Sequence, residues 1–217
     1  MKMLKSLLDT IYPRFCLLCE DYLLQNENIF CSTCQNNIKG NGASVVWNLY
    51  QKDCFLNKYA LFPFNEGSKA QKLVHAIKYE GNIVLAGDLG LKLGEKINEE
   101  IQLIIPVTLH RKKRSRRGFN QSEEIAKGIS EVLQCPVIVD QLIRKKHSTT
   151  QTKMNRKDRY QNIEGVFVLK NEELFIGKSL LLVDDVFTTG ATSYACAEIL
   201  QKANPKSISL AVIGKAE

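Results

Sequence analysis

The chain has 217 residues, of which 44% are hydrophobic, and its formal net charge is +7. This length accommodates one sizeable α/β domain and a small appendage. No apolar run approaches the roughly 18 residues that a membrane span requires, so we expect no membrane insertion. The excess of positive charge favours a polyanionic ligand without identifying it.

The first twelve residues combine lysines and leucines. Asp9 interrupts them, and no small-residue cleavage site follows. We therefore expect a short amphipathic helix, not a signal peptide. Because nothing marks the chain as secreted, we expect it to work in the cytoplasm.

Two cysteine pairs come next, each with the spacing Cys-x2-Cys and with eleven residues between them. Four thiolates at this spacing can close a tetrahedron around Zn²⁺ and leave no open coordination position, so we expect a structural zinc. An iron–sulfur cluster fits the spacing too, and disulfides are disfavoured in a reducing compartment. The expected ligands are Cys16, Cys19, Cys31 and Cys34. The single cysteines at 54, 135 and 196 are interpreted as packing residues.

The rest of the chain alternates apolar runs of strand type with helical patterns. This alternation predicts a doubly wound parallel α/β sheet with flanking helices. A boundary at 40–42 divides the chain into an N-terminal domain, 1–40, and a larger domain, 41–217. The expected strands or extended segments are 43–64, 102–107, 137–142, 165–169, 179–184 and 207–213, and the expected helices are 67–78, 83–97, 120–133 and 190–203.

Positive charge is concentrated in two segments that we expect to be loops. Residues 110–117 carry six Lys or Arg, and residues 144–159 carry seven. Such runs repel themselves unless they are solvated or bound to a ligand. For any single basic residue, exposure to solvent is the better explanation, whereas the two clusters taken together favour binding of a polyanion. Candidate ligands are a pyrophosphate group and a nucleic-acid backbone, whose binding is salt-dependent.

The most informative stretch runs from Leu180 to Thr192. An apolar strand ends in Asp184 and Asp185, a Thr/Gly/Ala/Thr loop follows, and then a helical pattern begins. Ligands of open α/β sheets bind at the carboxyl ends of strands, and backbone N–H groups at a helix N-terminus bind anions. Carboxylates accept hydrogen bonds from ribose hydroxyls while the loop holds a phosphate. The pattern therefore predicts a sugar-phosphate site.

This stretch resembles the phosphoribosyl pyrophosphate (PRPP) motif of type I phosphoribosyltransferases. Further segments, taken in order, resemble the ComF (ComFC) family, which is linked to competence for DNA uptake. The segments Lys78–Gly81 (Lys-Tyr-Glu-Gly) and Arg116–Gln121 (Arg-Arg-Gly-Phe-Asn-Gln), together with the cysteine pairs, make this resemblance specific. The family usually has proline where Thr108 stands here.

The resemblance implies a type I phosphoribosyltransferase fold with a small N-terminal zinc-binding domain whose ligands are four cysteines, and Mg²⁺ that accompanies PRPP. Asp184 and Asp185 match the ribose-binding acids. The 5′-phosphate loop corresponds to Val186, Thr188, Thr189, Gly190, Ala191 and Thr192. Residues expected near pyrophosphate or another polyanion are Lys78, Val107, Thr108, His110, Arg111, Arg116 and Arg117.

Two functions stay open at this point. One is transfer of phosphoribosyl to an acceptor that no residue pattern identifies. The other is a catalytically silent module that senses PRPP or a nucleotide. Such a module would bind single-stranded DNA or other competence and recombination proteins during natural transformation. No residue stands out as a general base or other catalytic group.

Overall fold

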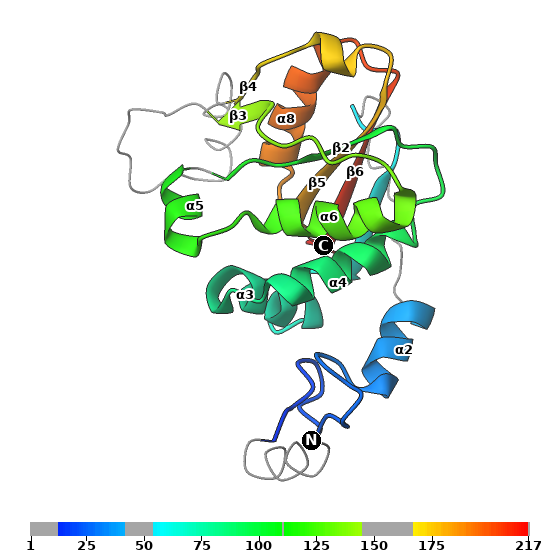
Figure 1. The fold of residues 1–217 in the computed structure, drawn as a ribbon, viewed down its shortest axis with the longest axis vertical. Helices are drawn as coiled ribbons and strands as arrows, with labels where there is room; N and C mark the ends of the chain where they lie inside the picture. Colours follow the sequence, from blue (N-terminus) through cyan, green and yellow to red (C-terminus); the bar gives the residue numbers. More distant parts are fainter. Residues whose placement is uncertain (1–12, 42–53, 110, 145–166, 217) are drawn as a thin grey trace.

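The computed structural model describes residues 13–41, 54–109, 111–144 and 167–216 (Figure 1). Its strands are β1 Lys58–Pro63, β2 Leu103–Pro106, β3 Leu142–Arg144, β4 Phe167–Leu169, β5 Ser179–Phe187 and β6 Ser207–Lys215. Its α-helices are α2 Ser32–Asn41, α3 Lys69–Glu80, α4 Ile83–Gly94, α5 Arg111–Arg117, α6 Gln121–Leu133 and α8 Ala191–Gln201, and Glu173–Phe175 forms a 3₁₀ turn. None of the helices in these ranges has the length and apolar character to cross a membrane.

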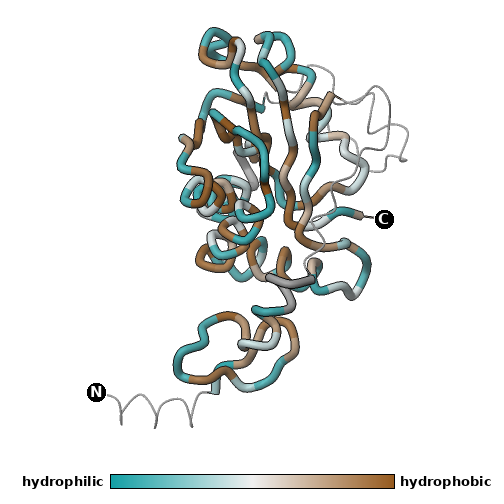
Figure 2. Tube along the Cα trace, turned by 90° about the vertical axis from the view of Figure 1, so that its right-hand side faces the viewer, coloured by the Kyte–Doolittle hydropathy of each residue, from teal (hydrophilic) through white to brown (hydrophobic). Residues whose placement is uncertain are grey.

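The expected parallel sheet is confirmed. Four strands lie in the order β1-β6-β5-β2, and every neighbouring pair is parallel. Alternate residues of β5 face opposite layers, as the pleat requires. Leu181 and Val183 pack into a cluster shared with α3, α4 and α6. Leu180 and Leu182 pack with α8 on the other face. Hydrophobic residues accordingly follow the strands through the centre of the molecule (Figure 2).

Two expectations from the sequence are wrong in the described part. The basic segment from residue 111 to 117 forms helix α5 instead of a loop. The segment 137–142 is not a strand: Val137 makes one isolated bridge to Ile104, and the strand begins only at Leu142, paired antiparallel to β4. Helix α2 ends at Asn41, inside the range 40–42, and the domain boundary expected there stays a prediction. The expected helix over 1–12 and most of the second basic segment lie outside the described residues.

Helices α4 and α6 approach each other at glycines. A Cβ on Gly90 would lie 2.2 Å from the carbonyl oxygen of Ile125, and one on Gly128 would lie 2.2 Å from that of Gly87. The two backbones are therefore in direct contact, and no side chain separates them. This contact sets the position of α6, whose first residues reach the carboxyl end of β5.

Replacing Gly90 with alanine should destabilise the protein by about 1–3 kcal/mol, because the added methyl group forces the two helices apart. Gly87, one turn earlier on α4, is the matched control, since a Cβ there meets nothing within 4 Å. Gly87→Ala should instead stabilise the helix by about 0.5–1 kcal/mol. Denaturant unfolding of the two variants measures both effects, and equal shifts would contradict the close packing.

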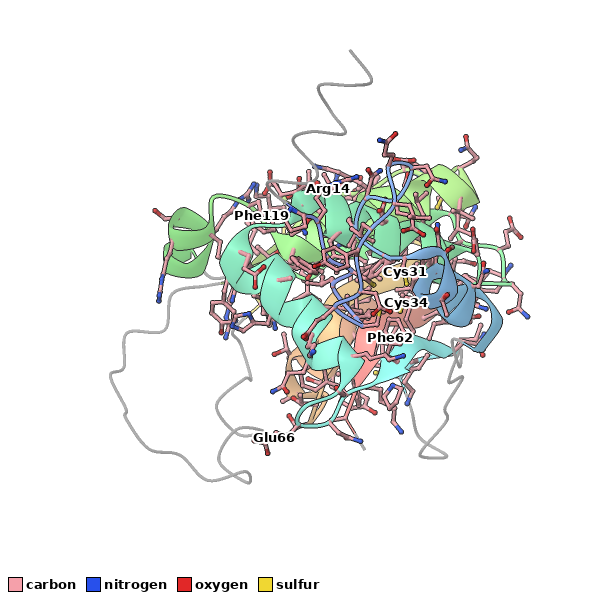
Figure 3. All side chains as sticks on the ribbon, turned by 90° about the horizontal axis from the view of Figure 1, so that it is seen from below. Arg14, Cys31, Cys34, Phe62, Glu66 and Phe119 are labelled. Carbon is pink, nitrogen blue, oxygen red and sulfur yellow. The ribbon has the colours of Figure 1, made fainter. Side chains whose placement is uncertain are left out.

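Residues 13–41, which we call the cysteine module, lie at the lower end of the molecule below α3 and α4 (Figure 1). Cys31 and Cys34 belong to the same continuous buried cluster as Phe62 of β1 (Figure 3). The ion pair between Lys72 of α3 and Glu20, 2.7 Å long, adds a surface contact. The module thus shares its core with the sheet domain.

Candidate functional site

Asp184 and Asp185 lie near the carboxyl end of β5, an internal strand between β6 and β2. Asp185 is buried, whereas Asp184 is half-buried. The sequence places both acids in one stretch of chain, and the structure adds their neighbours. These come from α3 and α6.

Asp185 is held by two side chains that converge on one oxygen. The ammonium of Lys78, at the end of α3, lies 2.7 Å from Asp185 Oδ2. Gln121, the first residue of α6, donates from Nε2 to the same oxygen at 2.7 Å. The side chains of Lys78 and Asp185 are only 22% and 10% exposed. A paired, hydrogen-bonded carboxylate of this kind tolerates burial that an isolated one would not.

Asp184 has a different environment. Its Oδ1 accepts hydrogen bonds from Ser122 Oγ at 3.2 Å and from the backbone N–H of Asp185 at 2.9 Å. Burial and the neighbouring charge of Asp185 raise the pKa of Asp184 to about 7. The two adjacent acids therefore differ: one is neutralised by a lysine, and the other ionises near neutral pH.

The loop after the acids turns into α8 through Gly190, whose φ is +74°. The left-handed region favours glycine. A Cβ here would also meet the ring of Phe187 at 2.5 Å and that of Tyr194 at 2.7 Å. Gly190 caps α8 without a side-chain hydrogen bond, and Thr189 Oγ1 accepts from the N–H of Ala191 at 3.4 Å. A short loop thus joins the acids to the first turn of α8, whose N-terminus can bind an anion.

The start of α6 contains functional candidates that sequence reasoning missed. Asn120, Gln121 and Ser122 are polar and at most 5% exposed. Asn120 caps α6 and donates to the carbonyl of Val107 at 3.2 Å, while its two neighbours bond the acids. The sequence gives one indication of their importance: they are three consecutive polar residues that overlap the segment Arg116–Gln121, which was used above only for the family resemblance. The sequence does not indicate that Asp184 and Asp185 of β5 are their hydrogen-bond partners.

Three of the residues expected near pyrophosphate line one cavity of about 420 Å³, and one of them, Lys78, is ion-paired with Asp185. Arg117 Nη1 donates to Gln121 Oε1 at 2.9 Å, and its guanidinium lies 5.7 Å from the ring centroid of Tyr79. The cavity is therefore connected to Asp185 through both Lys78 and Gln121. Its described lining is Lys78, Tyr79, Glu80, Gly81, Arg116, Arg117 and Phe119.

Val107 and Thr108, which are expected in the same group, are not among the described residues that line this cavity. Val107 is buried in the core and Thr108 donates from Oγ1 to the carbonyl of Leu142, so the threonine contributes a structural contact. His110 and the side chain of Arg111 lie outside what the structure describes. Two arginines of the basic segments have internal roles as well. Arg114 pairs with Glu123 and Asp140 at 3.8 and 3.5 Å, and Arg144 lies over the ring of Phe167.

The four expected metal ligands are brought together. The Sγ atoms of Cys16, Cys19, Cys31 and Cys34 all lie within 4.8 Å of one another. Cys19 Sγ and Cys31 Sγ are 3.6 Å apart, close to the separation of about 3.8 Å that four Zn–S bonds of ~2.3 Å give in a tetrahedron. The cluster has the donor set and the size of a metal site with four cysteine ligands.

The thiols of this cluster do not ionise alike: burial and hydrogen bonds to the neighbouring sulfurs raise the pKa of Cys34 to about 11 and that of Cys19 further, whereas the pKa of Cys16 is lowered. Burial opposes ionisation of Cys16, but backbone hydrogen bonds from Cys19, Cys31 and Leu18 together outweigh it and lower the pKa of that thiol to about 6. Glu27 lies in the loop between the pairs, and its carboxylate accepts from the N–H groups of Leu24 at 2.8 Å and Ser32 at 2.6 Å. The loop between the pairs is thereby tied to the start of α2.

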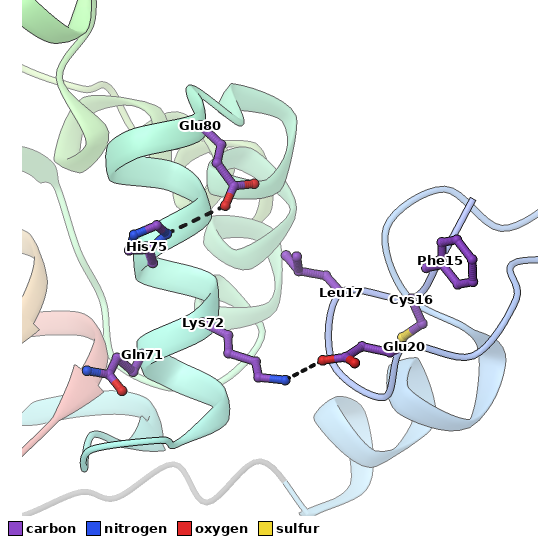
Figure 4. A pocket seen from close by; sticks show the side chains of 8 residues that line it. All are labelled: Phe15, Cys16, Leu17, Glu20, Gln71, Lys72, His75 and Glu80. Carbon is purple, nitrogen blue, oxygen red and sulfur yellow. Dashed lines mark hydrogen bonds and ion pairs between the residues drawn. The ribbon is translucent and has the colours of Figure 1, made fainter. Parts of the chain in front are cut away.

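A second cavity, of about 490 Å³, lies between the cysteine module and α3 (Figure 4). Lys72 is ion-paired with Glu20 at 2.7 Å, and His75 Nδ1 lies 3.5 Å from Glu80 Oε1. This balance contrasts with the cavity at Lys78, where Arg116 and Arg117 add positive charge. The cavity at Lys78 is thus the better anion site of the two.

Comparisons with known proteins agree with this arrangement. A family model described as phosphoribosyl transferase domain matches residues 119–216, which include the acids, the loop and α8. Competence protein F of Haemophilus influenzae is 37% identical over 112 residues, 50% of this chain and 48% of that protein. The match therefore spans about half the length of that relative. Competence protein ComFC of Bacillus subtilis is 22% identical over 233 aligned positions, 92% of this chain and 94% of that protein.

Among solved structures, glutamine PRPP amidotransferase from B. subtilis matches 58% of this chain and 25% of its own, with 20% identity and a TM-score of 0.43. The parallel sheet, the matched phosphoribosyl transferase domain and the N-terminal cysteine cluster together define a phosphoribosyltransferase fold with a cysteine-rich N-terminal extension. In sequence, the chain is therefore similar to the competence proteins of the ComF family, and its residues 119–216 match a phosphoribosyl transferase domain.

Proposed function

We propose that this protein binds PRPP together with Mg²⁺ at the carboxyl end of β5 and transfers its phosphoribosyl group to an acceptor. The observation that carries the proposal is the acid pair placed directly before a glycine-capped helix. The carboxylates that would bind the ribose hydroxyls and the loop that would bind the phosphate then lie on one unit, formed by β5, the loop that follows it and α8. The acceptor is not identified by any described residue.

Each part of PRPP has a place in this arrangement. The ribose hydroxyls donate to Asp184 and Asp185, and the 5′-phosphate rests on the loop 188–192 at the N-terminus of α8. The pyrophosphate group occupies the cavity lined by Lys78, Arg116 and Arg117. Mg²⁺ enters as part of the substrate, bound to pyrophosphate oxygens. The three subsites follow the order of the groups along the ligand.

The chemistry follows from charge. As the bond between the anomeric carbon and pyrophosphate breaks, its electron pair leaves with the pyrophosphate, and positive charge develops on the sugar. The acceptor supplies the electron pair for the new bond. Cationic side chains around the cavity stabilise the departing negative charge, and the acids hold the sugar in place. Positioning and electrostatics are thus the protein's contribution.

The cysteine cluster completes the proposal as a structural zinc site. Four sulfur ligands leave no coordination position for substrate, so the metal would stabilise the module and take no part in the reaction. With this site, we propose the division into an N-terminal zinc domain, 1–40, and a phosphoribosyltransferase-like domain, 41–217.

Isothermal titration of the purified protein with PRPP in the presence of Mg²⁺ tests the proposal. We expect saturable binding with one site per chain. Release of pyrophosphate when candidate acceptors are added then separates an enzyme from a silent PRPP-binding module. If PRPP binds but no candidate acceptor causes release of pyrophosphate, the result favours the silent module, with single-stranded DNA as a candidate partner. Absence of PRPP binding would contradict both.

A further inference from the structure

We propose that Lys78 makes the site selective for a ribose that carries a diphosphate over ribose 5-phosphate, by serving two anions in turn. Without ligand, its ammonium neutralises Asp185. When a diphosphate enters the adjoining cavity, Lys78 transfers to it and releases the carboxylate for the ribose. This inference rests on the proposed function and concerns the same site.

The first step of the argument is the position of Lys78. Its ammonium lies 2.7 Å from Asp185 Oδ2, and both side chains are largely buried. Lys78 also lines the cavity that contains Arg116 and Arg117. The flexible side chain of Lys78 therefore lies between Asp185, which we propose binds the ribose, and the cavity, which we propose binds the diphosphate. A lysine is suited to such an exchange, because its charge sits at the end of a four-carbon stem.

The second step is competition for Asp185. An ammonium at 2.7 Å reduces the power of this carboxylate to accept from a ribose hydroxyl. It also repels Mg²⁺, which the ligand brings with its diphosphate. A ligand without diphosphate competes with Lys78 for this carboxylate and offers the ammonium no other anion. A ligand with diphosphate supplies that anion next to the site, so the exchange costs little.

The third step concerns what holds Asp185 after Lys78 leaves. Gln121 Nε2 donates to the same oxygen at 2.7 Å, and Gln121 Oε1 in turn accepts from Arg117 at 2.9 Å. The carboxylate therefore keeps one hydrogen bond throughout the exchange and is never buried without a partner. Gln121 acts as a positioning residue, and Lys78 is the residue that moves.

The first experiment needs no variant. Ribose 5-phosphate is titrated into the wild-type protein with Mg²⁺, with and without saturating inorganic pyrophosphate. Since pyrophosphate draws Lys78 away from Asp185, we expect it to raise the affinity for ribose 5-phosphate about tenfold, the order of one charge-assisted hydrogen bond. Unchanged or weaker binding in the presence of pyrophosphate overturns the proposal.

The second experiment uses Lys78→Met, with Lys72→Met as the matched control. Lys72 lies on the same helix and is also ion-paired, but its partner is Glu20 on the cysteine module. In Lys78→Met, PRPP should bind more weakly and ribose 5-phosphate more tightly, so that the ratio of the two affinities falls about tenfold or more. Lys72→Met should leave this ratio unchanged.

The outcomes separate this inference from the function on which it rests. If Lys78→Met weakens both ligands equally while the wild-type protein binds PRPP, only the selectivity role of Lys78 is wrong. If the wild-type protein binds no PRPP, the proposed function and this inference fall together. If Lys78→Met does not fold, the effect of pyrophosphate on the wild-type protein decides alone.

Discussion

Replacing Cys31 with serine should abolish metal binding and disrupt the cysteine module. Cys31 is buried, and its Sγ accepts from the N–H of Cys34 at 3.4 Å and lies 3.6 Å from Cys19 Sγ. Zinc binding contributes about 10–16 kcal/mol to the folding of zinc-finger peptides, so loss of one ligand removes the main support of a module this small. Elemental analysis should give about one zinc per wild-type chain and almost none for the variant.

The disruption should extend beyond the module, because it shares a continuous buried cluster with α3 and β1. We therefore expect a lower midpoint of thermal unfolding for Cys31→Ser, and a similar shift when the wild-type protein is treated with a chelator. Cys54→Ser is the control, since Cys54 lies outside the cluster of four and should leave the metal content unchanged. Wild-type protein that contains iron, or no metal, would refute the zinc assignment.

Changing Asp184 and Asp185 together to alanine should abolish measurable PRPP binding. Two charge-assisted hydrogen bonds to the ribose are lost, each worth roughly 1.5–3 kcal/mol, so affinity should fall by at least two orders of magnitude. Titration calorimetry with PRPP and Mg²⁺ measures the loss. Wild-type affinity in the double variant would rule out the acids as the ribose site.

The matched control is Asp140→Asn. Asp140 is an exposed acid that is ion-paired with Arg114, and its φ of +62° is one that asparagine tolerates. This variant also removes a carboxylate, but it should retain PRPP affinity. Thermal unfolding of the double variant distinguishes a lost ligand contact from a lost fold, because Asp185 also anchors Lys78 and Gln121.

The errors of sequence reasoning have local physical causes. The like charges of residues 111–117 predict a loop because they repel one another, yet arginine and lysine are good helix formers. In the structure Arg114 finds Glu123 and Asp140 as partners, and the segment becomes helical. The segment 137–142 has the composition of a strand, but the chain turns at Asp140 with a positive φ and breaks the pairing.

The sequence by itself determined what is contiguous in the chain. The paired cysteines, the alternation of strands and helices, and the acids followed by a glycine loop are each a short run. Residues in such a short run are close in space whatever the rest of the chain does, so their local structure follows from the run itself. The resemblance to ComF proteins depended on the same short segments, and the comparisons bear it out.

Only the tertiary structure decided which side chains surround the acids. Lys78 comes from the end of α3 and Gln121 from the start of α6, and both reach Asp185 because parallel strands with helices between them bring helix ends to one edge of the sheet. The contact of α4 with α6 at Gly90 sets how closely α6 approaches. Such distances depend on packing between elements remote in the chain, which no local pattern encodes.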